Sequence, residues 1–581
     1  MKHTLKKMMG VVLSLLLGVS TVLAAVGCKG PSLPGNYTEE VDVNRTQLYV
    51  YNYDGGFGSE WLTKVKQRYE ELHANDVYEP GTGKRGIQIM MNNTKNGVTS
   101  ETIKSGQDEV YFIENMYYYS LRYDGALMDI TDAVSGENPY EPAKTIESKL
   151  TAEQQNFYGI KGAREDGKTQ YLGVPHYFGT YGLVYNKDLF DEKGYYFLDG
   201  YDENSNLEDK FIYYDTDKKT AGPNGQYGDD DDGLPTTYQE FYWLLEYISR
   251  MNSQTALSWT GQYYTQYLGF LLNSLVADYE GLDQMMLNFT FDGTATDLGS
   301  ISGGSFAEDA NDLQIMEENG WELKRQAGVY YALDFIENLV DTEMYHNSNA
   351  FTDSYSHLDN QQDFLMSGVD GVTTPIAMTV DGMWWQSESS QVFSSMASRY
   401  GDQYSMENRN LRWMPLPKAT KEKAAEAAKK IANGGNGYTV TDSLYSLCCV
   451  SSGIEDWKLP IAIDFIQFCN TDESLIEFTT TTNTVKALTY EIDETVLEQL
   501  SPYGRSLIEY IQNADIVYPY SQAELYINNS SMFRADEYYR ATVNGATKNY
   551  PAQAFHVDGI SAEDYFTGLA TYYKSSWNTL A

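Results

Sequence analysis

Two kinds of side chain that can do chemistry dominate the sequence: aromatic rings with a polar edge, and carboxylates. The 581 residues include 50 Tyr, 22 Phe and 9 Trp, together 14% of the chain, and 82 acidic residues against 41 basic ones. Tyr, the most abundant of the rings, suits surfaces that need a wet, hydrogen-bonding edge. The formal net charge of −41 repels phosphate backbones and argues against a nucleic-acid-binding protein.

Paired carboxylates could hydrolyse a glycosidic bond. Enzymes of that kind hold two carboxyl groups about 5 Å or about 6.5–9.5 Å apart and raise the pKa of one of them. With 82 acidic residues many pairs are possible, so their number alone does not indicate a reaction. The GxSxG and HExxH patterns do not occur in the sequence. We therefore expect no enzymatic activity, and a secreted glycoside hydrolase stays open as the alternative.

A run of acidic residues at 228–233 could hold a metal ion. Its carboxylates are hard oxygen ligands of the kind that Ca²⁺ prefers, but the spacing of an EF-hand is not met. A solvated acidic loop is the favoured interpretation, and we expect no cofactor. The candidates, should Ca²⁺ bind, are Asp229, Asp230, Asp231 and Asp232.

The first 28 residues predict export and a lipid anchor. Lys2, Lys6 and Lys7 precede an uncharged apolar stretch, which is the arrangement of a secretory signal. Residues 23–28, LAAVGC, resemble a bacterial lipobox, which implies cleavage after residue 27 and acylation of Cys28. An ordinary signal peptide with an incidental cysteine is the alternative. Residues 28–44 contain Gly, Pro and Ser without periodicity and predict a lipidated tether.

The elements that must position the site alternate between strands and helices. Residues 47–53, 86–91 and 109–113 predict strands, and residues 60–73 carry apolar side chains at helical spacing. This alternation is typical of an α/β sheet. Ligands of such sheets bind beyond the carboxyl ends of the strands. That rule places Asp54, Glu114 and Asn115 beside one cleft.

Three segments, in order, resemble the extracellular solute-binding proteins of carbohydrate ABC transporters, the family-1 proteins related to the maltose-binding protein. The first is YLGVPHYFGTYGLVYNK at 171–187, continued by DLF at 188–190. The second is IAMTVDGMWW at 376–385. The third is GGNGYTV at 434–440, followed by LPIAIDFIQF at 459–468. Together they span most of residues 45–490.

The resemblance implies an α/β fold with two periplasmic-binding-protein-like lobes, a hinge and a ligand cleft. We expect lobe one at 45–170 plus 436–480 and lobe two at 171–435 plus 481–581. Insertions near 200–235 and 280–330 would enlarge lobe two. Closure of the lobes on a ligand would be a hinge motion.

The resemblance also implies a function without chemistry. A monomer, anchored through Cys28 on the outer face of the cytoplasmic membrane of a Gram-positive bacterium, would capture a carbohydrate, most simply an oligosaccharide. It would then deliver the sugar to an ABC transporter permease. A sugar sensor or adhesion module on the same fold is a further alternative, because a fold does not fix a function.

Sugar chemistry selects the candidate ligand residues, since apolar C–H faces stack on rings while hydroxyl rims need polar partners. Trp384 matches the stacking tryptophan of the family, although packing in a core would explain it too. Carboxylates at the rim could instead cap helices, and the tyrosines could simply pack on strands. The full set of candidates is Trp384, Trp385, Asp381, Tyr177, Tyr181, Asp54, Glu114 and Trp259.

Overall fold

The computed structural model describes residues 37, 39–114, 117–164, 166–214, 216–367, 369, 374–534 and 538–580. The expected signal segment, the acylated Cys28 and most of the tether lie outside these residues, as does Asn115. Within the described ranges, no helix combines the length and the apolar composition that crossing a bilayer needs.

The first lobe is built on a five-stranded sheet with the order β2-β1-β3-β16-β6. Strand β1 pairs in parallel with β2 and β3, whereas β16 runs antiparallel to β3 and β6. The strands predicted at 47–53, 86–91 and 109–113 are confirmed within a few residues. The strands are β1 (Thr46–Tyr53), β2 (Ile87–Thr94), β3 (Val110–Ile113), β6 (Gly173–Val174) and β16 (Leu447–Val450).

Helices cover both faces of this sheet because one side of each is apolar. The predicted helix at 60–73 is confirmed as α2, which buries Trp61, Leu62, Val65 and Tyr69. The indole of Trp61 lies 5.6 Å from the Phe478 ring of α16. The helices are α2 (Glu60–Leu72), α3 (Ser100–Ser105), α4 (Tyr118–Tyr123), α5 (Thr131–Val134), α6 (Ala152–Tyr158), α15 (Leu459–Cys469) and α16 (Asp472–Thr482); the small hairpin is β4 (Gly159–Ile160) and β5 (Gln170–Tyr171).

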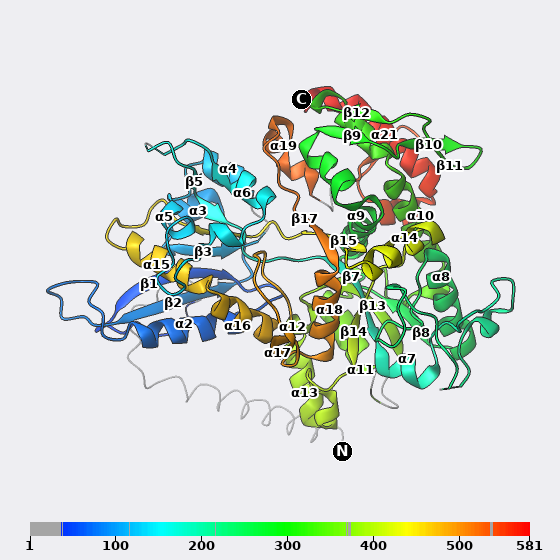
Figure 1. Cartoon of the computed structure of the whole chain (residues 1–581), viewed down its shortest axis with the longest axis horizontal. Helices are drawn as coiled ribbons and strands as arrows, with labels where there is room; N and C mark the ends of the chain where they lie inside the picture. Colours follow the sequence, from blue (N-terminus) through cyan, green and yellow to red (C-terminus); the bar gives the residue numbers. More distant parts are fainter. Residues whose placement is uncertain are drawn as a thin grey trace, which may run out of the picture.

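The second lobe is built on a four-stranded sheet with the order β14-β7-β13-β8, beside the first lobe (Figure 1). Its strands are β7 (Tyr181–Asn186), β8 (Thr255–Ser258), β13 (Ile376–Gly382) and β14 (Leu411–Met414). Its helices are α7 (Lys187–Lys193), α8 (Tyr238–Glu246), α9 (Tyr264–Thr290), α10 (Ala327–Asp341), α11 (His357–Met366), α12 (Trp385–Glu388), α13 (Ser390–Tyr400), α14 (Lys421–Ala432), α17 (Glu494–Leu497) and α18 (Pro502–Gln512). The two-stranded parallel sheet of β15 (Tyr438–Thr441) and β17 (Ala514–Val517) adjoins them.

Three segments carry the chain between the two main sheets: 175–180, 442–446 and 483–493. They lie side by side, because Ser443 donates its backbone N–H to the Gly179 carbonyl at 2.8 Å and Ser446 Oγ donates to the Tyr177 carbonyl at 2.7 Å. Buried Lys486 of the third segment places its Nζ 3.0 Å from Nδ1 of His176 in the first. The borders expected from the sequence, at 171, 436 and 481, each precede one of these segments by a few residues.

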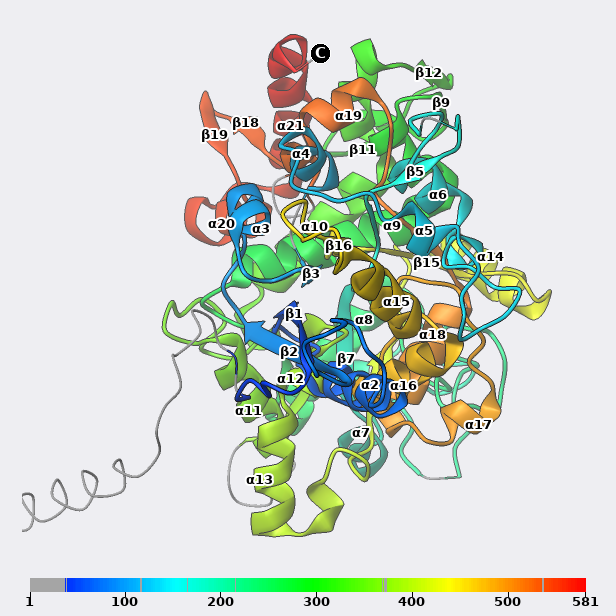
Figure 2. The ribbon, with the colours of Figure 1, turned by 90° about the vertical axis from the view of Figure 1, so that its left-hand side faces the viewer.

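The last sixty residues pack on the insertion predicted at 280–330, and the two form one layer at the top of Figure 1. Trp577 donates its indole N–H to the Glu317 carbonyl at 2.6 Å, and Tyr538 donates to Asn288 Oδ1 at 2.8 Å. Figure 2 shows α19 and α21 of this layer at one end of the molecule and α13 at the opposite end. The elements are β9 (Gly293–Ala295), β10 (Gly299–Ser302), β11 (Ser305–Glu308), β12 (Leu313–Ile315), α19 (Glu524–Asn528), β18 (Ala541–Val543), β19 (Ala546–Lys548), α20 (Pro551–Asp558) and α21 (Ala562–Ser576).

Candidate functional site

Trp384 lies at the point where the two lobes meet. It follows the last residue of β13 by two positions, and 8% of its surface is accessible to solvent. From lobe one, Gly56 approaches so closely that a Cβ there would lie 1.8 Å from Cδ1 of the indole. From lobe two, the ring of Tyr181 meets the indole edge-on, with centroids 5.1 Å apart. The structure therefore holds the lobes closed over this tryptophan.

Aromatic rings continue from Trp384 into lobe one. The Phe57 ring lies 5.9 Å from the indole and stacks on Tyr177 at 4.7 Å. Tyr177 is fully buried in the first crossing segment, and its hydroxyl donates to Asn52 Oδ1 at 3.1 Å. The structure thus uses this predicted ligand residue to join the crossing segment to strand β1.

A buried amide links two carboxylates on the lobe-two side. Gln361 of α11 donates its Nε2 to Asp381 Oδ2 at 3.1 Å and to Glu388 Oε2 at 2.9 Å. Ser389 donates to the Oε1 of the same glutamine at 2.9 Å, which fixes the orientation of the amide. His357 adds a contact of 3.3 Å between its Nε2 and Glu388 Oε1. Glu388 is therefore held rigidly at the start of the cleft.

Burial and mutual repulsion set the charge of these carboxylates. Burial, with the charge of Glu388, raises the pKa of Asp381 to about 7. Glu114 of lobe one has its pKa raised to about 8 by burial and by the charges of Glu388 and Asp442. Burial opposes ionisation of Glu388 as well, but its hydrogen bond and charge interaction with His357 bring its pKa below the usual value. Near neutral pH the junction thus holds an ionised Glu388, an Asp381 that is about half protonated and a Glu114 that is largely protonated.

A groove of about 690 Å³ opens beside this junction, between the two lobes. Asp54, Phe57 and Lys64 line it from lobe one, and Phe393 and Gln391 from lobe two. Burial raises the pKa of Asp54, and the Lys95 charge opposes that shift. Hydroxyl groups supply much of the remaining wall: Ser59, Ser387, Ser390, Ser394, Ser405, Ser501, Thr480 and Thr481. Such a groove offers many hydrogen-bond donors and acceptors to a polar ligand.

The structure brings four of the predicted ligand residues to the junction or its groove: Trp384, Tyr181, Asp54 and Glu114. Asp381 lies behind them, fully buried. Trp385 and Trp259 have no exposed surface, so neither ring is free for a ligand in this conformation. Trp385 packs on Tyr503 at 5.4 Å because it begins α12 facing inward. Trp259 donates its indole N–H to the Ala350 carbonyl at 2.8 Å.

Sequence reasoning missed Glu388, His357 and Gln361. Glu388 could have been found, because it follows the end of the motif at 376–385 by only three residues. His357 and Gln361 come from α11, about twenty residues before the motif, and only the packing of α11 against β13 brings them near.

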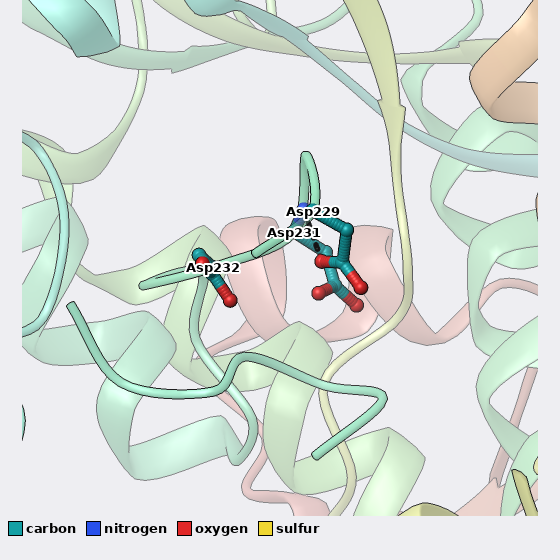
Figure 3. Close-up of side chains that lie close together, drawn as sticks. All are labelled: Asp229, Asp231 and Asp232. Atoms are coloured by element: carbon teal, nitrogen blue, oxygen red, sulfur yellow. Dashed lines mark hydrogen bonds between the residues drawn. The ribbon is translucent and has the colours of Figure 1, made fainter. Parts of the chain in front are cut away.

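The acidic run at 229–232 divides into two parts. Asp230 forms an ion pair with Arg412 at 3.0 Å. Asp229, Asp231 and Asp232 can each offer one carboxylate oxygen within 4.8 Å of the others, and Figure 3 shows the Asp229 and Asp231 groups lying together. Burial and the neighbouring Asp229 raise the pKa of Asp231 to about 9. These oxygens suit Ca²⁺ chemically, so Ca²⁺ binding stays the alternative to the solvated acidic loop that the sequence favoured.

No protein-family model and no curated protein matches the sequence. Solved structures do resemble the fold. The GacH receptor of Streptomyces glaucescens, solved unliganded and with acarbose, has a TM-score of 0.50 and 13% identity over 92% of this chain and 99% of its own. A chitin oligosaccharide binding protein gives the same score and identity over 92% and 100% of the two chains. So does a cyclic alpha-maltosyl-1,6-maltose binding protein from Arthrobacter globiformis.

These structural neighbours are sugar-binding proteins, and the similarity extends over most of the chain. At 13% identity the similarity establishes the fold. It confirms the expected α/β architecture of two lobes and the recognised likeness to solute-binding proteins.

The closed arrangement should not survive a side chain at position 56. In Gly56→Ala the added methyl group would overlap Trp384, so we expect the lobes to separate and the radius of gyration in small-angle X-ray scattering to rise. Gly97→Ala is the matched control, because a Cβ there has no described atom within 4 Å. An unchanged radius of gyration for Gly56→Ala would contradict the close approach of the lobes.

The protonated Glu114 should make stability fall as pH rises. Its folded-state pKa of about 8 exceeds its ordinary value of 4.5, so between those values the folded protein binds one proton that the unfolded chain releases. Glu114→Gln removes this loss. We expect urea unfolding to show the variant gaining stability relative to the unmodified protein between pH 5 and pH 8. Exposed Glu101→Gln is the control, and parallel stability profiles would contradict the assignment.

Proposed function

We propose that this protein is an extracellular substrate-binding protein that captures an oligosaccharide between its lobes and delivers it to an ABC transporter permease. One observation carries the proposal: a two-lobe α/β fold, joined by three adjacent crossing segments, in which both lobes line a polar groove of about 690 Å³. That volume is within the range of small-molecule sites. The fold neighbours, whose names state sugar ligands, support the same class of ligand.

The chemistry around the groove fits a carbohydrate. The indole of Trp384 and the ring of Phe57 can each receive the apolar face of a sugar ring. Ionised Glu388 and Asp54 can accept hydrogen bonds from hydroxyl groups, while protonated Glu114 can donate one. The serine and threonine hydroxyls of the groove supply both roles. A site that pairs each hydroxyl discriminates against ligands that lack one.

Capture requires the lobes to open first, because Gly56 covers Trp384 in the closed form. An open form would bind the sugar on one lobe, and closure would complete the contacts from the other. The three crossing segments are the elements whose backbone angles would change in such a hinge motion. No bond is made or broken in this cycle, so the proposal includes no enzymatic activity.

The location and the partners are part of the proposal. Signal-like residues 1–27 and the lipobox-like segment before Cys28 support a lipid anchor on the outer face of the cytoplasmic membrane of a Gram-positive bacterium. The closed monomer would then dock on the permease in the same membrane. Incorporation of a radiolabelled fatty acid into the protein, lost in Cys28→Ser, would test the anchor.

A glycoside hydrolase is the second candidate, and one observation favours it. Glu114 has a raised pKa and Glu388 a lowered one, and the charge of Glu388 acts on Glu114. An acid and an ionised carboxylate with opposed pKa shifts are the pair that glycoside hydrolysis uses. Sustained release of shorter sugars would establish this activity.

A titration of the mature protein against a panel of glycans tests the function directly. We expect saturable binding of an oligosaccharide, with a micromolar dissociation constant and no shorter sugars released on long incubation. Steady turnover would overturn the proposal in favour of the hydrolase. If the protein binds none of the oligosaccharides in the panel, sugar capture is excluded as its function.

Trp384→Ala should weaken the binding of that oligosaccharide at least tenfold, which corresponds to about 1.4 kcal/mol. The reason is loss of the ring on which a sugar face would stack. Trp457→Ala is the control, since this exposed tryptophan lies outside the groove. Unchanged affinity in a folded Trp384→Ala protein would exclude Trp384 from the binding site.

A further inference from the structure

A second cavity, of about 340 Å³, lies within lobe two. It is enclosed by the acidic loop at 224–231, by β14 and β15, and by α18. None of its lining residues lines the groove between the lobes. Its volume is many times the roughly 30 Å³ that a water molecule takes in the liquid, so it can hold an organic molecule.

Several buried side chains in its wall, Tyr438 and Trp413 among them, have polar atoms without a hydrogen-bond partner among the residues that the structure describes. Tyr438 is 4% exposed and Trp413 is 3% exposed. Neither the Tyr438 hydroxyl nor the Trp413 Nε1 finds a hydrogen-bond partner among the residues that the structure describes. Burying such a group unpaired costs about 1–3 kcal/mol, so a ligand that pairs with both would be favoured.

Carboxylates give this cavity its charge. Asp230 is neutralised by Arg412 at 3.0 Å. In the described part of the chain, no basic group lies within 4 Å of the carboxylates of Asp229, Asp231 or Glu509, and Asp231 Oδ1 is buried without a partner. The Tyr438 hydroxyl lies within the electrostatic influence of Asp231 and Asp229. Figure 3 shows the carboxyl groups of Asp229 and Asp231 lying together.

Aromatic rings form the rest of the wall. Tyr438 and Tyr510 have their ring centroids 4.7 Å apart, and Trp413 lies 6.3 Å from Tyr510. Ring faces attract cations and also receive the apolar faces of sugars. Carboxylates beside ring faces select a positively charged ligand over a neutral one of the same shape.

We propose that this cavity binds a small hydroxylated amine, of the class of the amino sugars. The ammonium group would lie between the Asp229 and Asp231 carboxyl groups and donate to Asp231 Oδ1. Because burial and Asp229 raise the pKa of Asp231 to about 9, Asp231 would release its proton to solvent when the cation binds. A ligand oxygen would accept the hydrogen bond from Trp413 Nε1, and the Tyr438 hydroxyl would pair with the amine or a neighbouring hydroxyl. A bare metal ion would leave the indole N–H unpaired and most of the cavity unfilled.

Calorimetric titration at pH 6.5 with glucosamine tests the proposal, with glucose and N-acetylglucosamine as neutral probes of similar shape. We expect glucosamine to bind at least tenfold more tightly than either. Asp231→Asn and Tyr438→Phe should each weaken glucosamine binding at least fivefold. Asp312→Asn, an exposed carboxylate that does not line the cavity, should leave it unchanged.

Two further results separate this cavity from the groove between the lobes. Trp384→Ala should still bind glucosamine, even if it no longer binds the oligosaccharide. A failure of the proposed function can therefore be distinguished from a failure of the proposal for this cavity. Equal binding of the three sugars, no binding of glucosamine, or retained affinity in folded Asp231→Asn and Tyr438→Phe would each overturn the inference. The inference would also be overturned if the protein bound Ca²⁺ but not glucosamine, and if Asp231→Asn abolished the Ca²⁺ binding.

Discussion

The contact between Trp384 and the backbone around it is the constraint on which the arrangement of the lobes depends. A Cβ at Gly56 would lie 1.8 Å from the indole, one at Gly382 would lie 2.4 Å away, and one at Gly179 would lie 2.8 Å away. These glycines come from lobe one, from β13 and from a crossing segment. Because all three lack side chains, backbone from both lobes and the hinge can close on one ring. The same ring must be uncovered when the lobes open.

Buried carboxylates are the second determinant of the junction. An acidic chain brings Glu114, Asp381 and Glu388 to one place, and repulsion would separate them if all were ionised. Gln361 and His357 stabilise the charge on Glu388, while burial keeps Glu114 largely and Asp381 partly protonated near neutral pH. The junction therefore offers both donors and acceptors without a net repulsive cluster, which is the combination that hydroxyl-rich ligands need.

Much of the framework could be predicted from the sequence, because local patterns fix local structure. The alternation in residues 47–53 and the helical spacing in residues 60–73 gave β1 and α2 almost to the residue. The layer of residues 280–330 and the last sixty residues could not be predicted, since their packing joins segments more than two hundred residues apart.

The sequence by itself determined the fold class, three strands of the first sheet and the candidacy of Trp384, because periodicity and short motifs act over a few residues. Only the tertiary structure decided which predicted rings stay accessible: Trp384 lies at the junction, whereas neighbouring Trp385 faces the core. It alone placed His357 and Gln361 beside Glu388, and Trp413 and Tyr438 beside the acidic loop. The physical reason is that burial and charge depend on contacts between distant segments, and no local pattern of residues encodes them.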